Sequence, residues 1–74
     1  MTDLETIQKL ESELNVSLAG RFTLFKDHSN VRTLDLSYLN LDKLPITVCE
    51  LDQLQKLDLE HNELSFLPKQ LSKL

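Results

Sequence analysis

The stretch LQKLDLEHNELSFLP at residues 54–68 decides the fold of this chain, because an earlier stretch has the same apolar pattern. That stretch is VRTLDLSYLNLDKLP at residues 31–45, and position 31 aligns with position 54 at an offset that then stays constant. The positions that recur are Val31, Leu34, Leu36, Leu41, Leu44, Pro45, Val48 and Leu51, with Leu54, Leu57, Leu59, Leu64, Leu67, Pro68, Leu71 and Leu74 as their counterparts. A leucine-based period in the twenties predicts a stacked solenoid, since one unit alone cannot bury its leucines.

Each unit is expected to begin with a short strand whose alternate leucines point inward, as Leu34 and Leu36 do in the first unit. Pro45 and Pro68 interrupt regular structure and open a short helical or 3-10 segment that packs back onto the core. We therefore expect repeats at residues 31–53 and 54–74 whose parallel strands lie about 4.8 Å apart.

Both stretches resemble the leucine-rich repeat family, whose pattern is LxxLxLxxNxLxxLP. The second unit matches every position of this pattern, including Asn62, whereas the first has Leu39 where the family has asparagine. In the family this asparagine binds backbone groups of the turn and forms a ladder along the stack. The resemblance implies that the ladder lacks a rung at Leu39 or begins only at Asn62, unless a turn shifted by one residue lets Asn40 substitute.

Residues 1–30 are expected to form an amino-terminal cap. Thr2 and Glu5 predict a capping box at the start of an amphipathic helix over residues 2–14. The apolar face of this helix would contain Leu4, Ile7, Leu10 and Leu14. A strand at residues 21–25 and a polar turn then predict a hairpin that covers the first repeat strand. This arrangement resembles the caps of bacterial and cyanobacterial leucine-rich repeat proteins of the 23-residue type.

The predicted fold class is therefore α/β. We expect a leucine-rich repeat solenoid in which an amino-terminal α-helix and β-hairpin cap precede two repeats that form a short curved parallel sheet.

Composition excludes several classes of function. The net charge of −4 is spread evenly, without the local surplus of lysine and arginine that a nucleic-acid binder needs. The amino terminus does not have the pattern of a secretory signal, and no apolar run is as long as the roughly 20 residues of a membrane helix. Membrane insertion is therefore not expected. Cys49 is the only cysteine, which fits a reducing compartment and predicts a cytoplasmic location.

The outward residues of the repeat strands are the candidate partner-binding surface, because the resemblance implies that the concave face of the sheet binds proteins. These residues are Thr33, Asp35, Ser37, Tyr38, Lys56, Asp58, Glu60 and His61. Asp35 and Asp58 would bring two like charges together on neighbouring strands, which is mildly destabilising. The pair is either an acidic notch for a partner's lysine or arginine, or two solvated carboxylates on a water-facing sheet.

No catalytic, cofactor or metal site is expected. His28 and His61 lack a cysteine or second histidine at ligand spacing, and a single glycine cannot form a phosphate-binding loop. Cys49 is expected to be a partly buried structural thiol. No nucleophile, base and orienting group form a recognisable set, so an enzyme is not predicted.

The carboxyl end forms a second candidate surface. Leu67, Leu71 and Leu74 have no following polar layer in the sequence, and an open strand edge invites addition of a strand from a partner or a second copy. The alternative is that the chain is a fragment of a longer solenoid.

The sequence thus predicts a noncatalytic protein-protein interaction module. Its partner would be a protein of unidentified kind, bound on the concave sheet face or at the open carboxyl-terminal edge, where self-association is also expected. The alternative is a structural capping fragment of a longer leucine-rich repeat protein, such as those that join the repeats to a GTPase or kinase domain.

Overall fold

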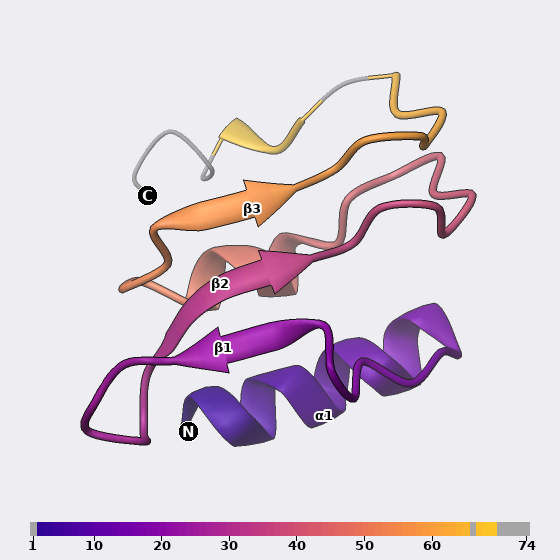
Figure 1. The fold of residues 1–74 in the computed structure, drawn as a ribbon. Coiled ribbons are helices and arrows are strands. Elements are labelled where there is room, and N and C mark those ends of the chain that lie inside the picture. Colours follow the sequence, from indigo (N-terminus) through magenta and orange to yellow (C-terminus); the bar gives the residue numbers. More distant parts are fainter. Residues whose placement is uncertain (1, 66, 70–74) are drawn as a thin grey trace.

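A computed structural model describes residues 2–65 and 67–69 of the chain. The elements in chain order are helix α1 (Asp3–Leu14), strands β1 (Phe22–Leu24) and β2 (Val31–Asp35), the 3-10 helix η1 (Ile46–Glu50) and strand β3 (Lys56–Asp58) (Figure 1). An α-helix together with a three-stranded mixed sheet gives an α/β fold.

Helix α1 begins at the capping box that the sequence predicts. The Thr2 hydroxyl accepts the Glu5 N–H at 3.2 Å, and the Thr2 N–H donates to the Glu5 carboxylate at 3.0 Å. The Thr2 hydroxyl also donates to this carboxylate at 3.0 Å, and the hydrogen bonds from the Thr2 N–H and hydroxyl lower the pKa of Glu5. Asn15 ends the helix in the left-handed conformation, with φ of 56°. The helix predicted over residues 2–14 therefore spans Asp3–Leu14, with Thr2 as its cap.

The first turn of α1 buries different residues from those predicted. Leu4 is 42% exposed, whereas Asp3 and Thr6 are buried. The Asp3 carboxylate accepts the Val31 N–H at 2.8 Å, which joins the start of α1 to the start of β2. Because successive helix residues point about 100° apart, turning Asp3 inward leaves Leu4 facing water.

The sheet has the order β1-β2-β3, with β1 antiparallel to β2 and β2 parallel to β3. Phe22 lies opposite Leu34, as expected of a hairpin that covers the first repeat strand. Leu34 lies opposite Leu57, and Asp35 lies opposite Asp58. The constant offset between the two stretches of sequence is therefore the register of the parallel strands.

The hairpin is shorter than predicted, because β1 covers Phe22–Leu24 instead of residues 21–25 and its register shifts between Thr23 and Leu24. Asp27 organises the connecting turn, where its carboxylate accepts the N–H groups of Ser29 and Asn30. Those backbone hydrogen bonds, and then the Asn30 side chain, lower the pKa of Asp27 to about 2.

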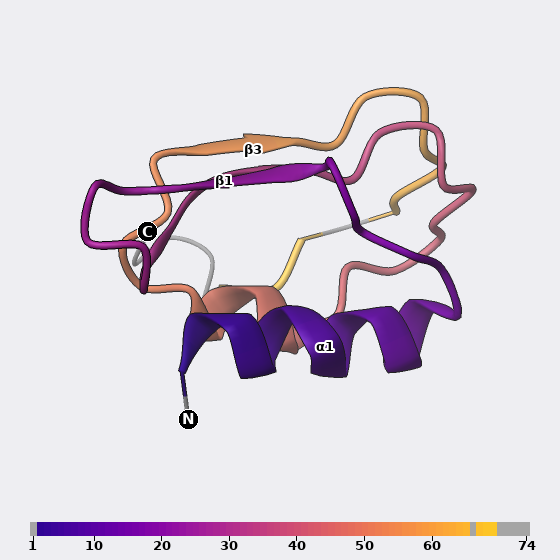
Figure 2. The same cartoon turned by 60° about the horizontal axis from the view of Figure 1, so that its bottom comes forward.

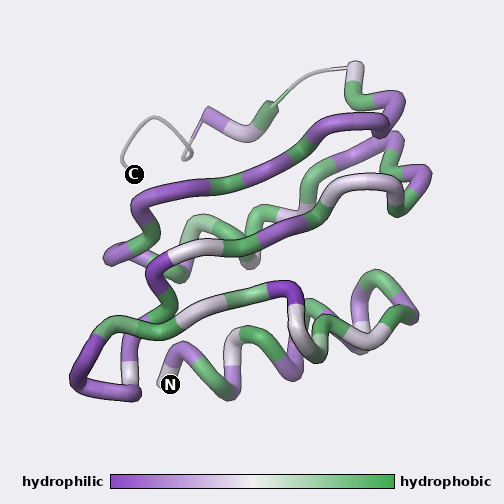
Figure 3. Tube along the Cα trace, viewed as in Figure 1, coloured by the Kyte–Doolittle hydropathy of each residue, from purple (hydrophilic) through white to green (hydrophobic). Residues whose placement is uncertain are grey.

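The described elements form two layers, with the sheet on one side and α1 and η1 on the other (Figure 2). Figure 3 shows polar and hydrophobic residues alternating along the strands, so each strand gives one face to the interior. The buried apolar side chains between the layers are Ile7, Leu10, Leu18, Val31, Leu34, Leu36, Leu41, Leu44, Val48, Leu51 and Leu54.

The two units are unequally buried. Leu34 and Leu36 are 1% and 0% exposed, whereas their counterparts Leu57 and Leu59 are only partly buried. The difference follows from position, because β2 is flanked by β1 and β3, and β3 is the last of the described strands. Among the described residues, the first unit and the amino-terminal segment therefore supply most of the buried apolar side chains.

Candidate functional site

The candidate site is the face of the sheet opposite α1 and η1, here called the outer sheet face. Thr33 and Asp35 of β2 and Lys56 and Asp58 of β3 alternate with the inward leucines. Thr33 lies opposite Lys56, and its hydroxyl is 2.6 Å from that of Thr23 on β1. A shallow hollow of about 220 Å³ lies between these β2 and β3 side chains.

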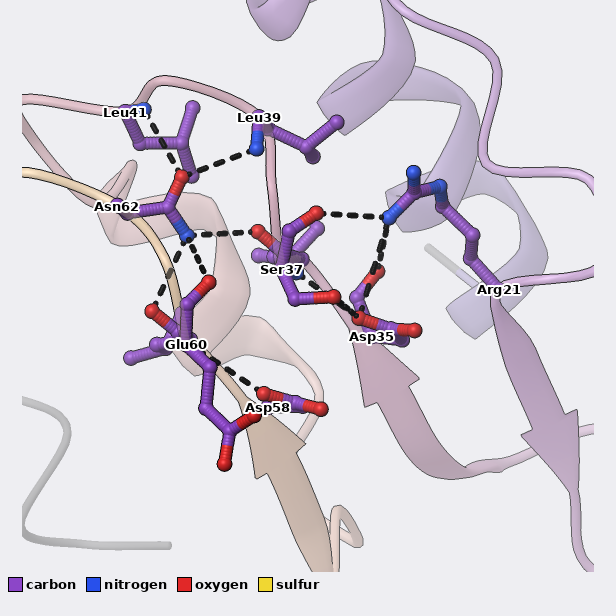
Figure 4. Close-up of polar contacts among 10 residues, drawn as sticks. Arg21, Asp35, Ser37, Leu39, Leu41, Asp58, Glu60 and Asn62 are labelled. Atoms are coloured by element: carbon purple, nitrogen blue, oxygen red, sulfur yellow. Dashed lines mark hydrogen bonds and ion pairs between the residues drawn. The ribbon is translucent and has the colours of Figure 1, made fainter.

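Asp35 and Asp58 use their carboxylates in the same way at equivalent positions. The Asp35 carboxylate accepts the N–H of Ser37 at 2.9 Å, and the Asp58 carboxylate accepts the N–H of Glu60 at 3.0 Å (Figure 4). Each aspartate thereby closes the turn that follows its strand. The repeat thus gives both aspartates a structural role, whether or not they also contact a partner.

Ser37 differs from the expectation that it faces outward, because it is only 8% exposed. Its hydroxyl donates to the Asp35 carboxylate at 2.5 Å, in addition to its backbone N–H. These two hydrogen bonds are the main reason that the pKa of Asp35 lies below its usual range, with smaller contributions from the charges of Arg21 and Lys56. Ser37 therefore supports Asp35 and offers little surface to a partner.

Arg21 belongs to the site, although the sequence did not single it out. Its guanidinium donates to the Ser37 carbonyl at 3.0 Å and lies 3.8 Å from the Asp35 carboxylate. Arg21 thereby binds the turn that follows β2, here called the first turn, from the amino-terminal side. No pattern in the sequence identifies this contact, because Arg21 reaches it only after β1 has paired with β2.

Asn62 binds the first turn from the other side. Its Oδ1 accepts the N–H groups of Leu39 and Leu41 at 3.1 and 3.0 Å, and its Nδ2 donates to the Leu36 and Leu59 carbonyls at 2.8 and 3.1 Å (Figure 4). Among the described residues the ladder therefore begins at Asn62, which is one of the two outcomes expected from Leu39. Asn40 is exposed in the left-handed conformation and does not substitute.

Tyr38 and His61 occupy equivalent positions, one residue after Ser37 and Glu60, in the turns that follow β2 and β3. These two turns are here called the rim of the outer sheet face. Their rings stack with centroids 4.1 Å apart and an angle of 14° between their planes. Both residues have left-handed backbones, with φ of 58° and 59°. The repeat thus brings together two rings that lie one full unit apart in the sequence.

The remaining reactive side chains do not join this site. His28 is exposed in the hairpin turn, and Cys49 lies on η1, where partial burial raises the pKa of its thiol. Within residues 2–65 and 67–69, no group of three or more His, Cys, Asp or Glu side chains is placed to hold a metal ion.

Of the leucines at the predicted open edge, Leu67 is 48% exposed. Leu71 and Leu74 lie outside the described residues. No helix in the described part of the chain is long and apolar enough to cross a membrane.

Comparison with known proteins supports the repeat. Residues 53–74 match the family model described as Leucine Rich Repeat. Comparison with curated proteins gave no match, and neither did comparison with solved structures. Leucine-rich repeats generally serve protein interaction and are generally noncatalytic. From the pattern, the strand register and this match, we conclude that residues 53–74 carry a leucine-rich repeat.

Proposed function

We propose that this chain is a noncatalytic module that binds a protein partner through the outer sheet face. The observation that carries this proposal is the regular spacing of polar side chains on that face, where Thr33 and Lys56, then Asp35 and Asp58, lie opposite each other on hydrogen-bonded strands. No other element of the described chain covers this face (Figure 2).

The rigidity of the face favours binding. The strands are fixed by backbone hydrogen bonds, and Arg21 and Asn62 bind the first turn from either side. A partner would therefore meet side chains that are already held in position, and less conformational entropy is lost when they are bound.

The size of the face limits the affinity. A stable interface buries roughly 800 Å² on each partner, which is about a sixth of the 5104 Å² of accessible surface on this chain. The outer sheet face and its rim would both have to take part. We therefore propose weak binding by a single copy, strengthened where self-association or a further repeat extends the face.

The proposed organisation is a cap at residues 1–30 followed by repeats at residues 31–53 and 54–74. Pairing of β1 with β2 supports this assignment of the cap, because it covers the backbone edge of the first repeat strand. The proposed location is the cytoplasm, on the basis of the single cysteine.

The test is to select binders from a random peptide library displayed against the purified chain and to map them by backbone amide NMR. Binders should shift the resonances of Thr33, Lys56 and Asp58. The variant Thr33→Arg places a long side chain in the middle of the face and should weaken binding about tenfold, the loss typical of one good interface contact. The matched control Ser12→Arg, on an exposed position of α1, should leave affinity within about twofold.

Binders that shift mainly α1 resonances, or that lose equal affinity in both arginine variants, would contradict the proposal.

A second candidate function is that of a structural piece of a longer stack. The partial burial of Leu57 and Leu59, compared with the nearly complete burial of Leu34 and Leu36, supports it. Appending one consensus repeat after Leu74 should then raise the denaturant midpoint of the whole chain, because the added layer covers these leucines. An unchanged midpoint would argue against this candidate.

A further inference from the structure

Tyr38 is an unusual residue for its position. It adopts the left-handed conformation, with φ of 58°, which asparagine and glycine accept more readily than a bulky aromatic residue. Burial does not compensate, because Tyr38 is 67% exposed. An exposed aromatic ring on an unfavourable backbone is a surface feature that stability alone does not account for.

The stack with His61 makes this ring a fixed platform. The ring centroids are 4.1 Å apart, and the two backbones are joined where the Tyr38 N–H donates to the Glu60 carbonyl at 3.1 Å. His61 is also exposed, so the stacked rings together present aromatic surface to water. A platform of this kind suits a flat group that stacks on rings.

The residues that precede His61 in the chain carry negative charge. Glu60 directly precedes His61, and in Figure 4 the side chains of Glu60 and of Asp58, the last residue of β3, extend away from the Asn62 amide. Asp35 on the neighbouring strand has Arg21 at 3.8 Å, and Lys56 and Asp58 line the same hollow. The group that complements this part of the rim is therefore a cation.

We propose that the Tyr38–His61 stack, with the adjacent carboxylates of Glu60 and Asp58, receives an arginine side chain of the protein partner. Arginine meets both requirements, because its planar guanidinium stacks on an aromatic ring while its N–H groups donate to a carboxylate. Lysine carries the charge but lacks the flat surface. This inference rests on the proposed function and adds the chemistry of the group that is recognised.

The experiment uses the full chain and three blocked peptides of the form Gly-Xaa-Gly-Xaa-Gly, in which Xaa is arginine, lysine or citrulline. Citrulline keeps the planar shape of arginine and lacks its charge. NMR titration with the arginine peptide should shift the backbone amides of Tyr38, Glu60 and His61. The arginine side-chain protons should move upfield through the ring currents. Affinity should fall about tenfold with citrulline and by a smaller factor with lysine.

Variants separate the two parts of the receptor. Tyr38→Asn removes one of the two rings and keeps a residue that accepts the left-handed backbone, so the upfield shifts should become much smaller. Tyr38→Phe keeps the ring and should retain them. Glu60→Gln should weaken binding of the arginine peptide several-fold. The matched control Glu13→Gln, on an exposed position of α1, should not change it.

Equal affinity for the arginine and citrulline peptides, or equal losses in Glu60→Gln and Glu13→Gln, would overturn the inference. It would also fail if Tyr38→Asn bound as the parent chain does. If any of these results is found while the display-selected peptides still map to Thr33 and Lys56, only the arginine inference is wrong and the proposed function stands. Arginine-dependent shifts at the stack, combined with selected binders that map to α1, would instead remove the proposed function and leave the arginine receptor in place.

Discussion

Replacement of Asn62 by alanine tests whether one side chain joins the two units. The Asn62 amide accepts two backbone N–H groups from the first turn and donates to carbonyl groups of both units, at distances of 2.8 to 3.4 Å. Alanine removes all of these hydrogen bonds and adds no new contact. The turn after β2 would then be held by Arg21, by the Asp35 carboxylate and by two backbone hydrogen bonds to the second unit. In these the Tyr38 N–H donates to the Glu60 carbonyl and the Glu63 N–H donates to the Leu41 carbonyl.

The magnitude follows from the number of hydrogen bonds. The shortest four contacts, at about 0.5–1.5 kcal/mol each, give a loss of roughly 2–6 kcal/mol in the free energy of unfolding. A chain of this length is expected to have about 4–11 kcal/mol in total. The Asn62→Ala variant should therefore fold, with a large fraction of its stability lost.

The assay is equilibrium unfolding in guanidinium chloride, followed by circular dichroism of the helix. With a slope near 2 kcal/mol/M, typical of a small domain, the unfolding midpoint should fall by about 1–3 M while the slope stays constant. The control is Asn40→Gly, because Asn40 is exposed and its φ of 55° suits glycine. That control should lose less than about 1 kcal/mol.

A loss below about 1 kcal/mol for Asn62→Ala, or a loss equal to that of Asn40→Gly, would refute the reasoning. It would mean that water replaces the amide at no cost and that the ladder asparagine does not join the units.

Three further predictions concern the cap, the hairpin and the core. Asp3→Ala should lower the free energy of unfolding by about 1–3 kcal/mol, because it leaves the buried Val31 N–H without its acceptor. Asp3→Asn should lose less in the same denaturation assay, and equal losses would contradict this role. Because the pKa of Asp27 is lowered to about 2, its contribution to stability is complete above about pH 4 and is lost as pH falls through 2. Acid titration of the unfolding free energy should accordingly show a shallower slope in Asp27→Asn, and an unchanged slope would be inconsistent with this. Leu34→Ala should cost about 2.5–5 kcal/mol and Leu57→Ala about half as much, since Leu34 is 1% exposed and Leu57 is only partly buried. Thermal unfolding of the two variants compares their losses of stability. A larger loss for Leu57→Ala than for Leu34→Ala would contradict the argument from burial.

Local patterns in the sequence predicted the parts of the fold that depend on neighbouring residues. The capping box of Thr2 and Glu5 is confirmed, because both partners lie within one helical turn. The parallel register of β2 and β3 follows from the constant offset between the two units, because equivalent leucines must meet in one core. The division into a cap and two repeats stays a prediction.

The candidate site was predicted less completely. The sequence placed Tyr38 and His61 among the outward residues of the candidate surface, and it did not predict that their rings stack. Ser37 was expected to face outward and is buried beside Asp35. A strand pattern assigns alternating faces, and it does not show where a strand ends and its turn begins.

The sequence by itself determined that leucines recur at a fixed spacing and predicted that strands one unit apart pair in parallel, as β2 and β3 do. It left open where the asparagine ladder begins, and the hydrogen bonds of Asn62 decided this. Only the tertiary structure decided that Asp3 turns inward to bind Val31 and that Arg21 binds the first turn. The physical reason is the separation of the interacting residues along the sequence. Repeats and helix caps follow from interactions that recur at known spacings. Hydrogen bonds between distant segments depend on how those segments are placed by packing.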